Sequence, residues 1–236
     1  MNTPVSLATS ERRSRMTFGT VAAIYAAFLF LVLANAFGSY FTDTSPNAEP
    51  PWQFFYYFTN QSNLLVLALL VVFAVANLGN GPLAAAAGRL MTQGVILGVT
   101  LYMMVVFVIV AVILNPFYTG AYTSVEYGKD LWVHVVSPAL MVALLLLYPW
   151  KGQASWRTVL AWMGYLIFYV GLANVIGTLV TKPDGSRDYP YDFLNPASYG
   201  GNFGVYLLVI AGLAVACFLV GMGLLRLKQR FDAGYR

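Results

Sequence analysis

Five consecutive hydrogen-bonding side chains, Thr59 to Asn63, open an otherwise apolar stretch of the chain. A polar group in hydrocarbon is costly unless it is paired, so this run predicts a packed or functional surface. At helical spacing Thr59, Ser62 and Asn63 share one face, because residues three and four apart are neighbours. Two interpretations stay open. The side chains bond neighbouring helices together, or Thr59 attacks a substrate after an adjacent base has activated it.

His134 is the only histidine in the chain. Histidine is the side chain that most readily exchanges protons near neutral pH, so His134 is the candidate general base for Thr59 or a proton relay. Asp130 lies four residues earlier, on the same face of a helix. It can either cap that helix or hold the imidazole in one tautomer. The structural alternative is a histidine that merely bonds a carbonyl at the membrane interface.

Other polar residues fall at a similar depth in the expected spans and can support the chemistry. Three asparagines are candidates to donate to a developing oxyanion, with packing as the alternative role: Asn35, Asn174 and Asn202. Ser62, Asn63 and Asp130 complete the supporting set. The single cysteine and single histidine exclude a disulfide framework and any multi-histidine or cysteine-ligated metal site. We expect no metal and no other cofactor.

The composition predicts that most of the surface faces lipid. Of the 236 residues, 59% are hydrophobic and 9% are charged, against roughly 45–50% and 25% in soluble domains. So few charged side chains cannot cover a soluble fold of this size. The net charge of +4 comes from residues that flank the apolar runs, as in membrane proteins. We therefore expect the bilayer as a partner and no nucleic acid.

Six apolar stretches are each long enough to cross the bilayer, which takes about 20 residues. None contains Lys, Arg, Asp or Glu. The pattern predicts an all-α fold, a polytopic bundle of six transmembrane helices in a single membrane domain, 1–236. The expected spans are 16–38, 54–78, 90–114, 131–150, 158–179 and 200–225.

The basic residues predict the orientation of these spans. With six spans, ten Lys and Arg residues fall on the side of the termini and three on the other side. Basic residues concentrate on the cytoplasmic side, so both termini are expected in the cytoplasm. The three on the outer side are Lys129, Lys182 and Arg187. The outer connections are longer and richer in turn-forming residues, so a ligand from water is expected to bind there.

Three segments carry a family resemblance. They are Phe58 to Leu65, Leu131 to His134 with Pro138, and Tyr189 to Leu194. In this order and position they resemble the androgen-induced-protein family of six-helix membrane proteins, including its bacterial members. The animal relatives are threonine hydrolases that cleave lipid esters, in particular fatty acid esters of hydroxy fatty acids. The resemblance implies Thr59 as nucleophile, His134 as general base, a membrane lipid as substrate and a bacterial cytoplasmic membrane as location.

Three functions are therefore weighed. The leading hypothesis is an intramembrane lipid-ester hydrolase. The second is a protein that binds or transports a small solute, with His134 as a relay. Because the polar residues gather in the outer half of the spans, they favour a pocket over a conduit. The third is a non-catalytic membrane scaffold in which Thr59, His134 and the asparagines only satisfy one another.

Overall fold

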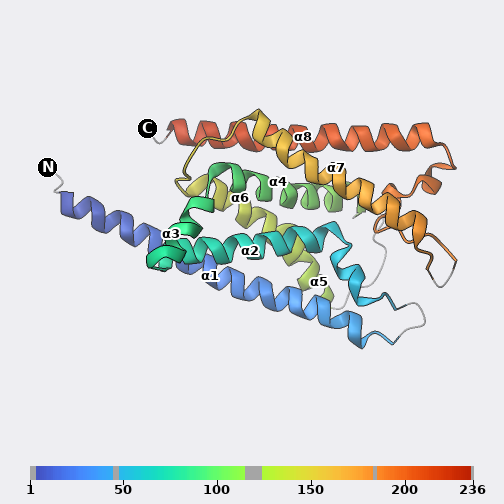
Figure 1. Cartoon of the computed structure of the whole chain (residues 1–236), viewed down its shortest axis with the longest axis horizontal. Helices are drawn as coiled ribbons and strands as arrows, with labels where there is room; N and C mark the ends of the chain where they lie inside the picture. The colour runs from blue at the N-terminus through green and yellow to red at the C-terminus, as the bar shows by residue number, and fades with distance from the viewer. Residues whose placement is uncertain (1–3, 45–47, 115–123, 183–184, 235–236) are drawn as a thin grey trace.

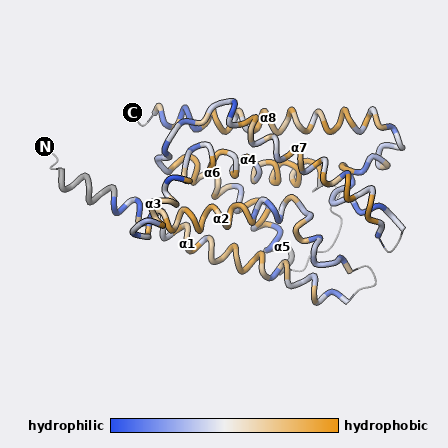
Figure 2. The backbone as a smooth tube through the Cα atoms, in the orientation of Figure 1, coloured by the Kyte–Doolittle hydropathy of each residue, from blue (hydrophilic) through white to orange (hydrophobic). Residues whose placement is uncertain are grey.

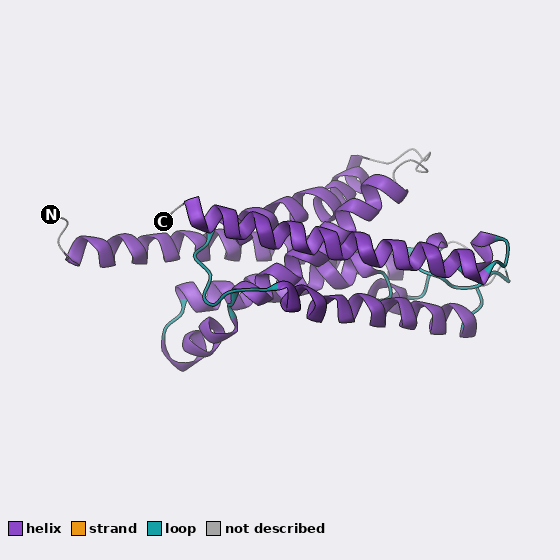
Figure 3. Ribbon diagram, turned by 90° about the horizontal axis from the view of Figure 1, so that it is seen from above, coloured by secondary structure: helices purple, strands orange, loops and turns teal. Residues whose placement is uncertain are grey.

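The computed structural model describes residues 4–44, 48–114, 124–182 and 185–234, with side chains at 12–44, 48–113, 128–182 and 185–234. Helices account for most of these residues, as Figure 3 shows. The α-helices are α1 (Pro4–Thr42), α2 (Phe58–Leu78), α3 (Gly81–Leu90), α4 (Gln93–Ile109), α5 (Ser124–Leu131), α6 (Ser137–Leu147), α7 (Trp156–Leu179) and α8 (Phe203–Gly234). Two π-helical segments, Val110–Leu114 and Trp132–Val136, continue α4 and join α5 to α6.

Within the described residues, six helical stretches are long and apolar enough to cross a membrane. The predicted all-α bundle of six spans is confirmed, and the chain is a multi-pass membrane protein. Apolar residues run along the helices and polar ones collect at the two ends of the bundle (Figure 2). The helix α1 begins and α8 ends at one end, here named the terminal end (Figure 1). The opposite end, where α2 begins, is named the site end.

The start of the second span differs from the prediction. The second span begins at Phe58 rather than at residue 54, because Pro51 opens a short 3-10 helix, Pro51–Phe55, and Tyr57 is extended. Thr59 consequently lies in the first turn of α2. The short helix α3 lies between this span and the next. Pro82 occupies its first turn, where the missing N–H costs nothing.

The helix α4 is the centre of the bundle. It packs against α2, α6, α7 and α8, whereas α1 lies mainly along α2. Its side chains are buried on all sides, as expected of a helix that is apolar all round. Gly98 allows the closest of these approaches, since a β-carbon there would lie 2.0 Å from the Trp162 ring.

The fourth span is interrupted by the π-helix Trp132–Val136, which carries His134. Proline has no N–H, and its ring clashes with the carbonyl four residues earlier. Pro138 stands in that relation to His134. The preceding turn is widened, and the Ser137 N–H donates to the Trp132 carbonyl five residues back. Such π-helical turns occur frequently at functional sites.

The connection between α7 and α8 folds back over the site end. The buried Gln53 donates through Nε2 to the Asp188 carboxylate at 2.8 Å. The Tyr56 hydroxyl donates to the Asp188 carbonyl at 3.0 Å and to the Ala173 carbonyl at 3.1 Å. These bonds fasten the connection to the segment that precedes α2, and so bring Tyr191 over the start of that helix.

Candidate active site

Thr59 and His134, from α2 and the π-helix, meet at the site end. The Thr59 Oγ1 atom lies 3.4 Å from His134 Nε2. On the other side of the ring, Nδ1 lies 2.8 Å from the Asp130 carboxylate and 3.1 Å from the Asp130 carbonyl. Hydroxyl, imidazole and carboxylate thus stand in the order of a catalytic triad, in which the acid orients the base.

The surroundings of the imidazole determine which nitrogen carries the proton in the neutral ring. Both groups near Nδ1 are oxygen acceptors from Asp130, so the proton belongs on Nδ1. This leaves the Nε2 lone pair facing the hydroxyl of Thr59. Asp130 therefore favours the tautomer that a general base needs, the second of the two roles that its spacing allowed. The 3.4 Å distance must shorten to about 2.6–3.2 Å for proton transfer, as is common in ligand-free sites.

Asn63 connects the two helices that carry the pair. It is fully buried, at 0% exposure. Its Nδ2 donates to the Thr59 carbonyl at 2.9 Å and to the Val133 carbonyl at 3.4 Å. Both donors of the amide are used, so Asn63 braces Thr59 against the π-helix and does not bind an oxyanion.

The hydroxyl of Tyr191 lies over the start of α2. It accepts from the Thr59 backbone N–H at 3.5 Å, one of the N–H groups that a first turn leaves without a carbonyl. Burial raises the pKa of Tyr191, while hydrogen bonds with Thr59 and its neighbours lower it. The phenol therefore stays neutral near pH 7 and keeps a proton to donate.

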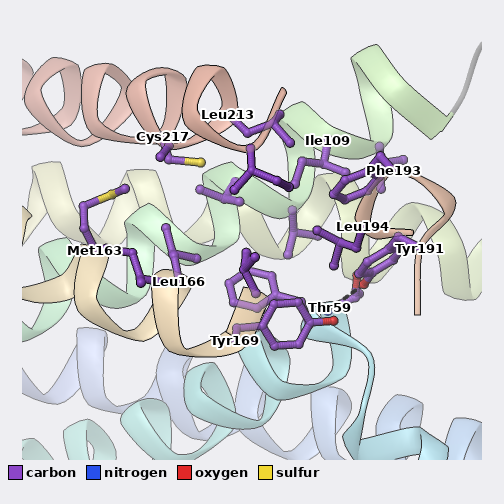
Figure 4. A pocket seen from close by; sticks show the side chains of 18 residues that line it. Thr59, Ile109, Met163, Leu166, Tyr169, Tyr191, Phe193, Leu194, Leu213 and Cys217 are labelled. Atoms are coloured by element: carbon purple, nitrogen blue, oxygen red, sulfur yellow. Dashed lines mark hydrogen bonds between the residues drawn. The ribbon is translucent and has the colours of Figure 1, made fainter. Parts of the chain in front are cut away.

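An apolar cavity begins at Thr59 (Figure 4). It has a volume of about 150 Å³ and lies between α4, α7 and α8. Thr59, Tyr169 and Tyr191 stand at one end, and Met163 and Cys217 at the other. Between them the lining is aliphatic, from residues such as Val106, Leu166, Ile210 and Leu213. The cavity fits a hydrocarbon chain whose polar end reaches Thr59.

The cavity is also open toward the surroundings of the bundle. Ile167 belongs to its lining and is 66% exposed. His134 does not line it. Thr59 is therefore the residue that joins the hydrocarbon space to the imidazole.

Four other predicted residues are placed away from the reacting pair. Ser62 is buried and donates to the Phe58 carbonyl of its own helix at 2.8 Å. Asn35 is exposed on α1. Asn174 donates to the Val170 carbonyl at 2.8 Å and to the Tyr206 hydroxyl at 2.6 Å, which ties α7 to α8. Asn202 caps α8, accepting from the Val205 N–H at 3.2 Å. The oxyanion role expected of the three asparagines is not supported, because these amides are bound or exposed elsewhere.

Neither Tyr191 nor Tyr169 was predicted as a site residue. Tyr191 belongs to the segment Tyr189 to Leu194, which carries part of the family resemblance. That resemblance could have indicated Tyr191 as a site residue. Tyr169 carried no such signal, because an aromatic residue in an apolar span is typical of packing. The Tyr169 hydroxyl donates to the Tyr56 carbonyl at 3.1 Å while its ring borders the cavity.

No protein-family model matches the chain, and no curated protein or solved structure matches it. Assignment of a function therefore depends on the site itself and on the three sequence segments.

Proposed function

We propose that this protein is an intramembrane lipid-ester hydrolase with Thr59 as nucleophile and His134 as general base. The observation that carries the proposal is the chain Thr59, His134 and Asp130, with contacts of 3.4 Å and 2.8 Å, at the mouth of an apolar cavity. Threonine is a weak nucleophile until a neighbouring base takes its proton. The resemblance of three segments to the androgen-induced-protein family supports the same pair.

The first half of the reaction forms an acyl-threonine. The substrate's acyl chain lies in the cavity with its ester carbonyl at Thr59. The Oγ1 atom bonds to the carbonyl carbon as its proton passes to His134 Nε2. The carbon–oxygen bond to the alcohol then breaks, and the alcohol leaves with the proton from His134. Asp130 stabilises the imidazolium between these steps.

The second half releases the acid. Water, reaching the site end from the aqueous side, gives a proton to His134 and bonds to the acyl carbon. Thr59 leaves with that proton, which restores the hydroxyl and the neutral ring. In both halves the oxyanion is stabilised by the Tyr191 O–H and by the Thr59 N–H, which exchanges its weak 3.5 Å bond to the Tyr191 oxygen for the oxyanion, a contribution of about 3–4 kcal/mol for one good donor.

The observed core supports a pocket over a solute path. Leu70, Phe73 and Met141 are at most 1% exposed and fill the bundle between the site end and the terminal end. A pathway for a polar solute needs polar groups along its length. The hydroxyl and imidazole are thus confined to one end.

We further propose that the termini lie in the cytoplasm and the site end faces outward, in the cytoplasmic membrane of a bacterium. The excess of Lys and Arg at the terminal end supports the orientation. The bacterial branch of the resembled family supports the location.

A fluorophosphonate probe tests the nucleophile. The purified protein should be labelled and should hydrolyse a long-chain ester, whereas Thr59→Ala should do neither. Ser62→Ala is the matched control, since it removes a buried hydroxyl from the next turn of α2 that bonds only its own helix. Labelling that persists in Thr59→Ala would reject Thr59 as the nucleophile.

A further inference from the structure

A second recess lies at the terminal end of the bundle. There α1, near Arg12 to Met16, passes the end of α2. The recess has a volume of about 460 Å³. Its lining combines cationic and amide groups with apolar side chains, namely Arg12, Arg15, Asn77, Asn80, Met16 and Leu78. Nothing in the proposed hydrolase reaction uses it.

Arg15 is held in a defined position in this recess. Its Nη2 donates to the Ala76 carbonyl at 3.2 Å, and its Nε donates to Asn77 Oδ1 at 3.4 Å. The carbonyls at the end of a helix carry partial negative charge, which favours a cation there. The Tyr148 hydroxyl also donates to Asn77 Oδ1, at 2.9 Å, and so anchors the acceptor. The guanidinium is therefore fixed before any ligand binds.

The recess has positive charge and, among the side chains that the structure describes, no carboxylate that balances it. Among the residues whose side chains the structure describes, the ion pairs involve His134, Lys182 and Lys228, and none includes Arg12 or Arg15. The lining residues that the structure describes include no acidic one. Asn80 precedes α3, makes no side-chain capping bond to that helix and adds the N–H donors of its amide to the recess. Two guanidinium groups and an amide match the oxygens of a phosphate.

The apolar part of the lining distinguishes a lipid from a free anion. Met16 and Leu78 are both exposed beside the arginines. A neighbouring hollow of about 590 Å³ shares Arg12 and Met16 and continues along α1 past Thr17, Thr20 and Val21. Cationic and apolar surfaces thus adjoin at the boundary of a span, where a phospholipid has its phosphate above its acyl chains.

We propose that this recess binds the headgroup of an anionic phospholipid. Arg12 and Arg15 contact the phosphate, Asn80 donates to it, and an acyl chain lies along Met16 and the adjoining face of α1. The ligand is a lipid of the leaflet at the terminal end, distinct from any substrate at Thr59.

Native mass spectrometry in a neutral detergent tests the proposal, with phosphatidylglycerol as the probe and phosphatidylcholine as the zwitterionic comparison. The detergent removes the surface potential of a charged bilayer, so only a built site retains the lipid. Arg12→Gln should weaken phosphatidylglycerol binding about fivefold or more. Loss of one basic contact costs about 1 kcal/mol, which corresponds to about fivefold in Kd. Arg12 is preferred to Arg15, because Arg15 also braces the end of α2.

Arg89→Gln is the matched control. It removes the same charge from the exposed face of α3, outside the recess, and should change binding less than twofold. Equal losses in the two variants, no loss in Arg12→Gln, or equal binding of phosphatidylcholine would overturn the proposal. Displacement of the lipid by inorganic phosphate alone would overturn it in favour of a free-phosphate site. An unchanged melting temperature of Arg12→Gln without lipid establishes that the variant is folded.

Discussion

The hydroxyl of Tyr191 lies 3.5 Å from the backbone nitrogen of Thr59, although 132 residues separate the two in the chain. This contact places a phenol hydroxyl and an N–H of the first helical turn beside the proposed nucleophile. The arrangement matches an oxyanion site, in which donors converge on the point where negative charge develops.

Tyr191→Phe should therefore lower kcat for ester hydrolysis by about 10²-fold with a small change in KM, because the lost donor acts in the transition state. Steady-state kinetics on a long-chain ester measure this. Tyr199→Phe is the control, since it removes a hydroxyl of the same connection that bonds the Phe193 carbonyl at 2.9 Å. A change confined to KM would show that Tyr191 only shapes the cavity.

Asp130→Asn should lower kcat by about 10³–10⁴-fold, because an amide no longer stabilises the imidazolium and can reverse the ring tautomer. The contact concerned is the 2.8 Å pair between Asp130 and His134. Asp192→Asn, which removes an exposed carboxylate of the same end, should retain activity. Activity within a few fold of the wild type in Asp130→Asn would mean that the carboxylate is not needed to orient or stabilise the ring.

Leu213→Trp should block the cavity and discriminate between substrates by chain length. Excluding four methylene groups costs about 3 kcal/mol at ~0.8 kcal/mol each, or roughly 10²-fold in kcat/KM for long-chain esters. Hydrolysis of an acetyl ester should persist. Leu208→Trp is the control, being on the same helix but 74% exposed and outside the lining. Equal effects on short and long esters would show that the cavity does not bind the acyl chain.

Alkaline pH should destabilise the fold through the tyrosines of the site end. Burial raises the pKa of Tyr57, and the Glu49 carboxylate, 2.8 Å from its hydroxyl, raises it further. A raised pKa means that the folded state holds the proton more tightly than the unfolded state. The resulting stability is fully present below the unfolded value of about 10 and is lost as pH rises above it.

The free energy of unfolding in detergent should thus fall above about pH 10, and Tyr57→Phe should make the decline shallower. Thermal unfolding across that range measures both slopes. Identical slopes for Tyr57→Phe and the wild type would exclude Tyr57 as a contributor.

Gly98→Ala should lower the free energy of unfolding by about 1–3 kcal/mol, the usual cost of overpacking. The added carbon would lie 2.0 Å from the Trp162 ring, so α4 and α7 must separate. Gly164→Ala has nothing within 4 Å and should be neutral or stabilising, because alanine favours a helix. The melting temperatures of the two variants in detergent decide the comparison.

The spans and the contact between Thr59 and His134 could be predicted from sequence because both follow from simple patterns. Charge-free apolar runs of sufficient length define the six spans. Thr59 and His134 fall near the starts of two spans that run in the same direction, so they have similar depth and can meet. The spacing of Asp130 placed it on the same face as the ring.

The remaining features depend on how the chain folds back, which local pattern does not contain. Residues 79–82, Gly-Asn-Gly-Pro, have the composition of a loop, yet they lead into α3. Asn174 could equally serve a substrate or bind a neighbouring helix, and only the packing of α7 against α8, which brings the Tyr206 hydroxyl to it, selects the second. Tyr191 reaches Thr59 because the Gln53 and Tyr56 bonds fasten its segment over α2.

The exposed wall of the cavity at Ile167 has a kinetic consequence for an enzyme of this kind. A substrate that enters through this wall reaches the cavity by lateral diffusion within the membrane leaflet. Its effective concentration is its mole fraction among the surrounding lipids, so diluting the ester with inert lipid should slow turnover even when the amount of ester per volume of suspension is constant.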